Sequence, residues 1–264
     1  MNFHRFSPAI LTLLVFLLAQ GLGTVLLLIT GQMTAPDFSM SLSTTQFSLV
    51  LMTVNIVAVL ACYIFLHNIR LVTTDDICSI VWRPGMLAIA GGVLGAMSVS
   101  VLTDGVKLPD MMRQMSLAMS CNVWGIIALT FVGPVTEELL FREAIEGEML
   151  RRGARPWMAI FVSAIAFSTV HLNLAQGLYA LPIGIIFGII YYKTGNIVLT
   201  ALLHILNNTI AALQLCIMGE SLEDLSYAEW FGSAAAAYVF MVLSGLLSLV
   251  LMKHFWTRYP SHKN

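Results

Sequence analysis

Long apolar stretches separated by short polar segments dominate this sequence and constrain its fold more than any other feature. A helix needs about 20 mainly apolar residues to cross the hydrocarbon core of a bilayer. Backbone groups in lipid must find hydrogen-bond partners within the protein, which favours helices over open sheets. Eight stretches are expected to span the membrane, at residues 8–29, 47–66, 86–102, 121–148, 156–171, 177–192, 197–217 and 231–255. The predicted fold class is therefore all-α, a polytopic membrane helix bundle of about eight transmembrane helices.

The composition excludes other common classes of protein. Only 10% of the residues are charged and 58% are hydrophobic, whereas soluble domains average about 25% charged residues. A chain with so little charge cannot cover a water-exposed surface, which excludes a soluble globule and a disordered chain. The first apolar stretch is longer than the core of a signal peptide, which has about 7–15 residues, so we expect a retained helix. No linker or repeat divides the chain, and residues 1–264 are expected to form a single integral membrane domain.

The basic residues predict an orientation in the membrane. Lysine and arginine collect in the cytoplasmic loops of membrane proteins. With the N-terminus in the cytoplasm, ten of the 13 basic residues fall on the inner side and only Lys107 and Arg113 on the outer side. The outer loop before the last helix is acidic instead, through Glu220, Glu223, Asp224 and Glu229. Eight spans with both termini in the cytoplasm fit this distribution.

The four cysteines carry no pairing signal. Cys62, Cys78, Cys121 and Cys216 are far apart in the sequence and form no CxxC or zinc-type spacing. Three of them fall inside apolar stretches, where a free cysteine behaves as a small hydrophobic side chain. We therefore expect packing roles rather than disulfides.

Three short polar segments interrupt the apolar stretches, at residues 136–142, 167–171 and 204–208. Ionisable side chains at membrane depth are rare and are functional candidates by default. Measured from the inner end of each helix at about 1.5 Å per residue, Glu137 lies roughly 21 Å deep, His171 roughly 22 Å and His204 roughly 16 Å. Because three helices bring polar groups to similar depth, we expect them to line one polar intramembrane cavity.

Helical spacing assigns these side chains to shared faces. His204 and Asn208 are four residues apart, as are Phe167 and His171, so each pair lies on one face of its helix. The Phe167 ring is expected to wall the cavity beside the His171 imidazole. Taken alone, an intramembrane histidine or asparagine can equally be a structural residue that forms a hydrogen bond between helices, rather than part of a functional site. The functional interpretation therefore rests on the whole set.

Glu138 and Arg142 are also four residues apart, in the order that favours an ion pair. Glu137 lies about 100° around the helix from Glu138, so neutralisation of Glu138 by Arg142 leaves Glu137 to face the cavity. Pro134 suits the first turn of a helix, which would place Thr136 and both acids near a positive helix end. Three further acids are expected on a solvated inner face beside the arginines that follow this helix: Glu143, Glu146 and Glu148.

This set of side chains suits the hydrolysis of a peptide bond. A carboxylate and an imidazole that share a water molecule can act as a general base. Amide and imidazole N–H groups can stabilise the negative charge that develops on the attacked carbonyl oxygen. No GxSxG, HExxH or DxD-type motif competes with this interpretation.

The polar segments also resemble a known family. The patterns Glu137-Glu138-x-x-x-Arg142, Phe167-x-x-x-His171 and His204-x-x-x-Asn208 follow one another in this order. From about residue 121 to residue 213 the sequence resembles the CPBP family, the CAAX-protease and bacteriocin-processing proteins that are also called the Abi family. The resemblance implies a multi-helix integral membrane endopeptidase whose cleft opens to the membrane and the cytoplasm.

The resemblance also implies roles for single residues. Glu137 and His171 are expected to activate water, and His204 and Asn208 to stabilise the oxyanion. The residues expected to support this site are Glu138, Arg142 and Phe167. The chain then divides into three N-terminal helices at 1–119, a CPBP-like catalytic core at 120–215, and the acidic outer loop with the last helix at 216–264.

Members of this family have been described both as metalloproteases and as metal-independent glutamate proteases. One carboxylate and two imidazoles could hold a divalent metal such as zinc together with a water molecule. The ligands would then be Glu137, His171 and His204. Metal-bound histidines also need second-shell acceptors, for which the sequence offers only Glu138, Asn173 and Asn207 nearby. We therefore expect no tightly bound metal.

The predicted function is an intramembrane endopeptidase in the plasma membrane of a prokaryote. Its expected partners are the lipid bilayer and a membrane-associated protein or peptide precursor, and the balance of 13 basic against 14 acidic side chains argues against nucleic acid. No residue pattern identifies a prenyl-binding groove or an oligomeric state.

Two alternatives belong to other functional classes. The first is a non-catalytic immunity or scaffold protein that keeps the pocket for binding. The second is a proton-coupled transporter in which Glu137 and His171 relay protons. Transport ranks lower because such proteins usually show repeated, paired broken helices, and Gly133-Pro134 is a single candidate break.

Overall fold

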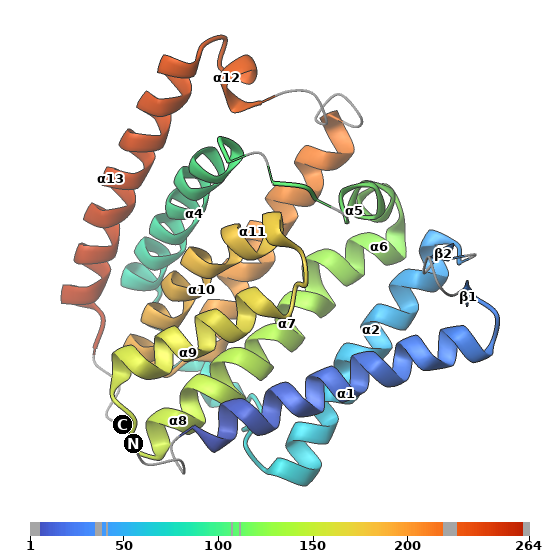
Figure 1. Cartoon of the computed structure of the whole chain (residues 1–264). Helices are drawn as coiled ribbons and strands as arrows, with labels where there is room; N and C mark the ends of the chain where they lie inside the picture. The colour runs from blue at the N-terminus through green and yellow to red at the C-terminus, as the bar shows by residue number, and fades with distance from the viewer. Residues whose placement is uncertain are drawn as a thin grey trace.

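The computed structural model describes residues 6–34, 39–40, 42–106, 108–110, 112–218 and 226–260. Within these residues the chain is a bundle of helices with one short antiparallel ladder, in which β1 (Met33–Thr34) pairs with β2 (Ser39–Met40) (Figure 1). The predictions for Lys107, Glu220, Glu223 and Asp224 fall outside the described residues.

Seven of the described helical segments are long and apolar enough to cross a bilayer, which confirms the predicted polytopic all-α fold. They are α1 (Ser7–Ile29), α2 (Thr44–Ala61) with the π-helical η2 (Cys62–Leu66), α4 (Trp82–Asp104), the segment Val123–Arg151, α10 (Leu174–Thr194), α11 (Ile197–Met218) and α13 (Ala234–Arg258). The remaining expected span, at residues 156–171, corresponds to α9 (Pro156–Thr169), which has only 14 residues. Such a helix covers about 21 Å, less than the hydrocarbon core of about 30 Å. The remaining helices are short: α3 (Thr74–Cys78), α5 (Arg113–Ser120) and α12 (Tyr227–Trp230).

The segment Val123–Arg151 is one long helix whose geometry changes along its length. Its parts are α6 (Val123–Ile127), η3 (Ala128–Val132), α7 (Gly133–Glu138), η4 (Leu139–Gly147) and α8 (Glu148–Arg151). The segments η3 and η4 are π-helical, a rare geometry that often marks functional sites. They flank α7, which carries both predicted acids.

Pro134 lies in the first turn of α7 as predicted, but the prediction of a free positive helix end beside it is wrong. Pro134 follows η3 without a break in the helix, and local π-helical adjustment is one way in which membrane helices tolerate the missing N–H of proline. The hydroxyl of Thr136 donates a hydrogen bond of 2.7 Å back to the Val132 carbonyl. Thr136 and the two acids therefore lie inside a continuous helix and not beside a free positive helix end.

Small residues allow α4 to pack closely in the bundle. α4 lies along α13 and also contacts α10 and α11. A Cβ at Gly92 would overlap the side chain of Leu203, and a Cβ at Gly91 would lie 3.1 Å from Cγ of Met252. Lipid offers no hydrophobic reason for helices to associate, so close packing at small residues contributes much of the attraction between them.

The long helix Val123–Arg151 is enclosed by its neighbours. The α9–α10 pair and α1 pack against η4, and α11 packs against α7 and η3 (Figure 1). Leu140, Ala144, Ile145 and Met149 are fully buried in this packing. The polar side chains of the same helix are thereby held inside the protein.

A sharp reversal between α5 and α6 sets where this helix begins. The side chain of Asn122 caps α6 by accepting hydrogen bonds from the backbone N–H groups of Trp124 (3.0 Å) and Gly125 (3.1 Å). A Cβ at Gly125 would collide with the backbone of Met119 at the end of α5. Only glycine therefore fits the close approach of the two chain segments.

We expect Gly125→Ala to destabilise the protein by about 1–3 kcal/mol, because the added methyl group forces the backbone of α5 and α6 apart. The matched control is Gly21→Ala in α1, where a Cβ meets no atom within 4 Å, and no loss of stability is expected. Thermal unfolding of both variants in detergent measures the difference. Equal midpoints for the two variants would contradict the packing argument.

Candidate active site

Helices that are far apart in the sequence meet around the predicted site. α7 carries the two acids, α9 ends shortly before His171, and α11 carries the second imidazole and the carboxamide. His204 lies beside Glu138, and Asn208 lies beside Leu129. These two contacts show that α11 runs antiparallel to α7 and η3.

His204 lies between the two neighbouring carboxylates. Its Nδ1 is 3.1 Å from Oε1 of Glu138, and its Nε2 is 3.6 Å from Oε2 of Glu137. The Glu137 side chain is 24% exposed, whereas that of Glu138 is fully buried. The structure thus brings an acid and an imidazole, 67 positions apart in the sequence, close enough for one water molecule to contact both.

Glu138 and Arg142 form the predicted ion pair inside the protein. Nε of Arg142 is 3.3 Å from Oε2 of Glu138, and both side chains are fully buried. Nη1 of Arg142 donates a hydrogen bond of 2.7 Å to Oγ of Ser163 on α9 and lies 3.7 Å from Oε2 of Glu146. The guanidinium also lies 5.5 Å from the centre of the Phe167 ring, within the range of a cation–π interaction.

Phe167 forms a common wall for both imidazoles. Its ring centre is 5.0 Å from that of His171 and 5.7 Å from that of His204, and both imidazoles stand nearly perpendicular to it. Nδ1 of His171 is 2.7 Å from the carbonyl oxygen of Phe167. Because a carbonyl oxygen can only accept, Nδ1 carries the proton, and Nε2 of neutral His171 is left as the acceptor.

A chain of hydrogen bonds fixes the orientation of the Asn208 carboxamide. The Tyr179 hydroxyl donates to Oδ1 of Asn207 (2.9 Å), and Nδ2 of Asn207 donates to Oδ1 of Asn208 (3.2 Å). Nδ2 of Asn208 then donates to the carbonyl of Leu129 (3.0 Å). A carboxamide nitrogen carries two protons, so this contact engages one of the two.

Tyr179 and Asn207 also line a cavity of about 420 Å³ beside α11. Most of its wall is apolar and comes from α4, α11, α12 and α13. The hydrogen-bond chain therefore leads from this cavity to Asn208.

The donor set does not fit a three-ligand metal centre. Among the described residues no group of three or more His, Cys, Asp and Glu side chains is placed to hold a metal ion. The contacts of His204 Nδ1 with Glu138 and of His171 Nδ1 with a carbonyl oxygen are of the kind that also orient metal-bound histidines, so the misfit lies in the spacing of the three ligands. We therefore derive no chemical step through a metal, and the expectation of no tightly bound metal stays a prediction.

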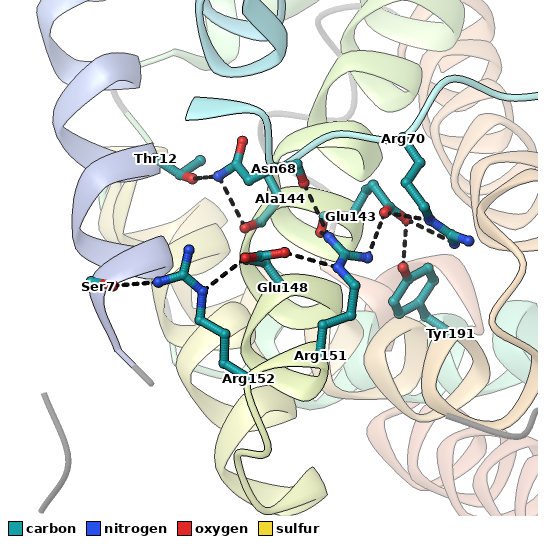
Figure 2. A network of polar contacts seen from close by, with 10 residues as sticks. All are labelled: Ser7, Thr12, Asn68, Arg70, Glu143, Ala144, Glu148, Arg151, Arg152 and Tyr191. Carbon is teal, nitrogen blue, oxygen red and sulfur yellow. Dashed lines mark hydrogen bonds and ion pairs between the residues drawn. The ribbon is translucent and has the colours of Figure 1, made fainter. Parts of the chain in front are cut away.

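The prediction of a solvated acidic face is wrong for two of its three residues. Glu143 is 1% exposed and Glu146 is fully buried. The Glu143 carboxylate accepts hydrogen bonds from Nε of Arg70 (2.9 Å), Nη1 of Arg151 (2.7 Å) and the hydroxyl of Tyr191 (2.6 Å). Figure 2 shows how these side chains converge on Glu143 from different parts of the fold.

The same network joins the N-terminal part of the chain to the end of the long helix. Glu148 accepts hydrogen bonds of 2.8 Å from both Arg151 and Arg152, and Arg152 donates to the hydroxyl of Ser7 (Figure 2). The hydrogen bond with Glu143 raises the pKa of Arg70 above its usual value, so Arg70 stays charged. Sequence reasoning missed this network because Arg70 and Tyr191 are remote from Glu143 in the sequence. The separate contact of Glu146 with Arg142 could have been predicted from their four-residue spacing.

The segment that carries this geometry also matches known proteins. Residues 119–210, about a third of the chain, match the family model described as type II CAAX prenyl endopeptidase Rce1-like. Over 88 residues the chain is 30% identical to the Bacillus subtilis (strain 168) protein named "Putative membrane peptidase YdiL". This match covers 33% of the chain and 36% of the relative, so the chain matches only about a third of the relative's length. No solved structure gives a significant match.

The fold and site define a polytopic integral membrane protein with ionisable groups buried among its helices. The matches then support the resemblance based on the three motifs, because residues 119–210 are similar to the Rce1-like family of CAAX prenyl endopeptidases and to a relative named as a membrane peptidase. The family match includes all four residues expected to take part in the chemistry.

We expect Glu143→Gln to cost about 1.5–3 kcal/mol of stability, because it weakens the charge-assisted hydrogen bonds that the buried carboxylate accepts from Arg70 and Arg151. The matched control is Glu148→Gln on the same helix, whose side chain is 17% exposed, and whose expected cost is below about 1 kcal/mol. Thermal unfolding of the purified variants in detergent compares them. A loss for Glu143→Gln no larger than that of the control would contradict the structural role of this carboxylate.

Proposed function

We propose that this chain is an intramembrane endopeptidase that hydrolyses a peptide bond in a membrane-associated protein or peptide. The observation that carries the proposal is the position of His204 between the carboxylates of Glu137 and Glu138, in a site walled by aromatic rings. A base and N–H donors close together in a water-poor site suit acyl transfer to water. The Rce1-like match over residues 119–210 and the name of the relative support the same class of reaction.

Glu137 is the general base in this proposal. It is the more exposed of the two acids, and Glu138 is already paired with Arg142. Glu137 takes a proton from a water molecule while the water oxygen forms a bond to the carbonyl carbon of the substrate. The same proton then passes to the leaving amine nitrogen as the C–N bond breaks, which returns Glu137 to its carboxylate form.

His171 orients this water molecule. Its Nδ1 is engaged by the Phe167 carbonyl, which directs the unprotonated Nε2 away from its own helix end. An acceptor in this position can hold one proton of the water while Glu137 takes the other. The imidazole and the carboxylate thereby share the task of activation.

His204 and Asn208 stabilise the oxyanion. With His204 protonated, Nδ1–H donates to Glu138, and Nε2–H points toward Glu137 and the developing oxyanion. A positive charge on His204 then lies beside the carboxylates of Glu137 and Glu138, which limits the cost of burying those two charges. The second N–H of Asn208 supplies a further donor.

We infer that the arginine-rich end of the bundle faces the cytoplasm. Arg151 and Arg152 lie at this end, and the contact of Arg152 with Ser7 places the start of α1 beside them. Lys193 lies 4.9 Å from the ring centre of Trp256, which places the end of α13 at the end of α10. The excess of basic residues at one end supports the predicted cytoplasmic termini.

We expect Glu137→Gln and His171→Ala each to lower proteolysis at least about 100-fold, because each removes a group that activates water. Membrane insertion and thermal stability should be unchanged. Glu148→Gln is the control, since it changes a carboxylate on the same helix outside the site. The measurement compares the new protein termini in membranes that contain the wild type, each variant or no enzyme.

Retention of full activity by both variants would show that this site is not catalytic. The non-catalytic binding function would then replace the proposal. Loss of activity together with loss of folded protein would be recognised from the thermal unfolding of the same preparations.

We expect Tyr179→Phe to lower kcat with KM unchanged, because loss of the hydroxyl frees Asn207 to rotate and Asn208 to lose its fixed orientation. The loss should be smaller than that of Asn208→Ala, which removes the donor itself and typically costs about 100- to 1,000-fold. Steady-state kinetics on a substrate found by the terminus comparison measures both constants. A change confined to KM would instead indicate that the cavity beside α11 binds the substrate.

A further inference from the structure

The structure places two cysteines side by side, one just before the long helix Val123–Arg151 begins and the other near the end of α11. Sγ of Cys121, at the C-terminal cap of α5, lies 3.6 Å from Sγ of Cys216 near the end of α11. Both are free thiols and both are exposed. The expectation of a packing role therefore suits Cys62, which is fully buried, and is wrong for this exposed pair.

We propose that Cys121 and Cys216 are a disulfide-forming modification site that ties α11 to the start of the long helix Val123–Arg151. The proposal concerns the thiol chemistry of this end of the bundle and stands independently of proteolysis. Its first support is the close contact of two accessible thiols that lie 95 positions apart in the sequence.

The geometry allows the bond to close with small movements. A disulfide needs its sulfur atoms at about 2.05 Å, so the two Sγ atoms must approach by about 1.5 Å. Cys121 lies at the reversal between α5 and α6, and Cys216 lies in the last turns of α11. Rotation of side chains at two helix ends can supply this approach without repacking the core.

The position along the helix pair gives the bridge a structural effect. α11 contacts residues 121–138 at three successive levels: Cys216 at Cys121, just before the long helix, and then Asn208 at Leu129 and His204 at Glu138 within it. The first contact is between thiols and the other two are hydrogen bonds. A covalent bond at the first level would fix the end of a helix pair whose middle carries the site.

The side of the membrane favours oxidation. The cysteine pair lies at the end of the long helix opposite to Arg151, and at the end of α11 opposite to Lys193. If the arginine-rich end is cytoplasmic, the pair faces the outer side, where disulfides form and persist.

The oxidant in this proposal is a disulfide compound. The thiolate of one cysteine attacks the disulfide RSSR, forms a mixed disulfide and releases the first RS⁻. The second cysteine then attacks the mixed disulfide at the protein sulfur, forms the Cys121–Cys216 bond and releases the second RS⁻. The two cysteines lose two protons and two electrons, and RSSR becomes two RSH.

The test uses the full chain in detergent with Cys78→Ser, which removes the other exposed thiol. After treatment with oxidised glutathione, we expect two of the three remaining thiols to resist maleimide labelling under denaturing conditions. The intact mass should fall by two hydrogen atoms, with no glutathione attached, and dithiothreitol should restore all three thiols. In the matched control, which also carries Cys216→Ser, Cys121 should instead retain one glutathione as a mixed disulfide.

A stability measurement tests the second half of the proposal. The oxidised protein should unfold at a midpoint roughly 5 °C or more above that of the reduced protein, because the bridge closes a long loop. The control with Cys216→Ser should show no such shift. Attachment of glutathione to both cysteines, or full maleimide labelling after oxidation, would overturn the disulfide site, and an unchanged midpoint would overturn its tying role.

Discussion

A charge in the interior of a membrane protein must be paired, and the fold around Arg142 follows from this constraint. The guanidinium is fully buried and is held by Glu138, Glu146 and the hydroxyl of Ser163. Loss of one partner of such a cluster usually costs about 3–5 kcal/mol, because the remaining charge is left without compensation. α9 is thereby held against the long helix by a polar contact that lipid cannot replace.

The long helix Val123–Arg151 acts as the polar axis of an otherwise apolar bundle. One cluster surrounds Arg142 at the depth of the site, and a second surrounds Glu143 and Arg151 nearer its end. Neighbouring helices leave room for these groups: a Cβ at Gly188 of α10 would lie 2.8 Å from Oε2 of Glu146. The same helix therefore provides both the internal cohesion of the protein and the acids of the candidate site.

The sequence allowed correct prediction of the features that depend on local pattern. Apolar runs gave the membrane helices, and four-residue spacing gave the Glu138–Arg142 pair because neighbours on one helix face are fixed by geometry. For contacts between helices, the sequence predicted only that the polar side chains lie at a similar depth in the membrane. It could not show that the carboxylates of Glu137 and Glu138 both reach the His204 imidazole. Glu143 and Cys121 were misjudged for the same reason, since their partners Tyr191 and Cys216 are remote in the sequence. The π-helical turns beside Pro134 escaped prediction because proline is compatible with either a helix start or a local change of helical geometry.

The shortness of α9 has a consequence for the lipid around the site. A helix of 14 residues is about 9 Å shorter than an average hydrocarbon core, and such hydrophobic mismatch is relieved by local thinning of the bilayer or by adjustment of the flanking residues. The residues after α9 include His171 and the capping Asn173, which are polar. Thinning at this point shortens the distance from bulk solvent to His171, and the proposed hydrolysis would draw its water by this route without an open channel through the bundle.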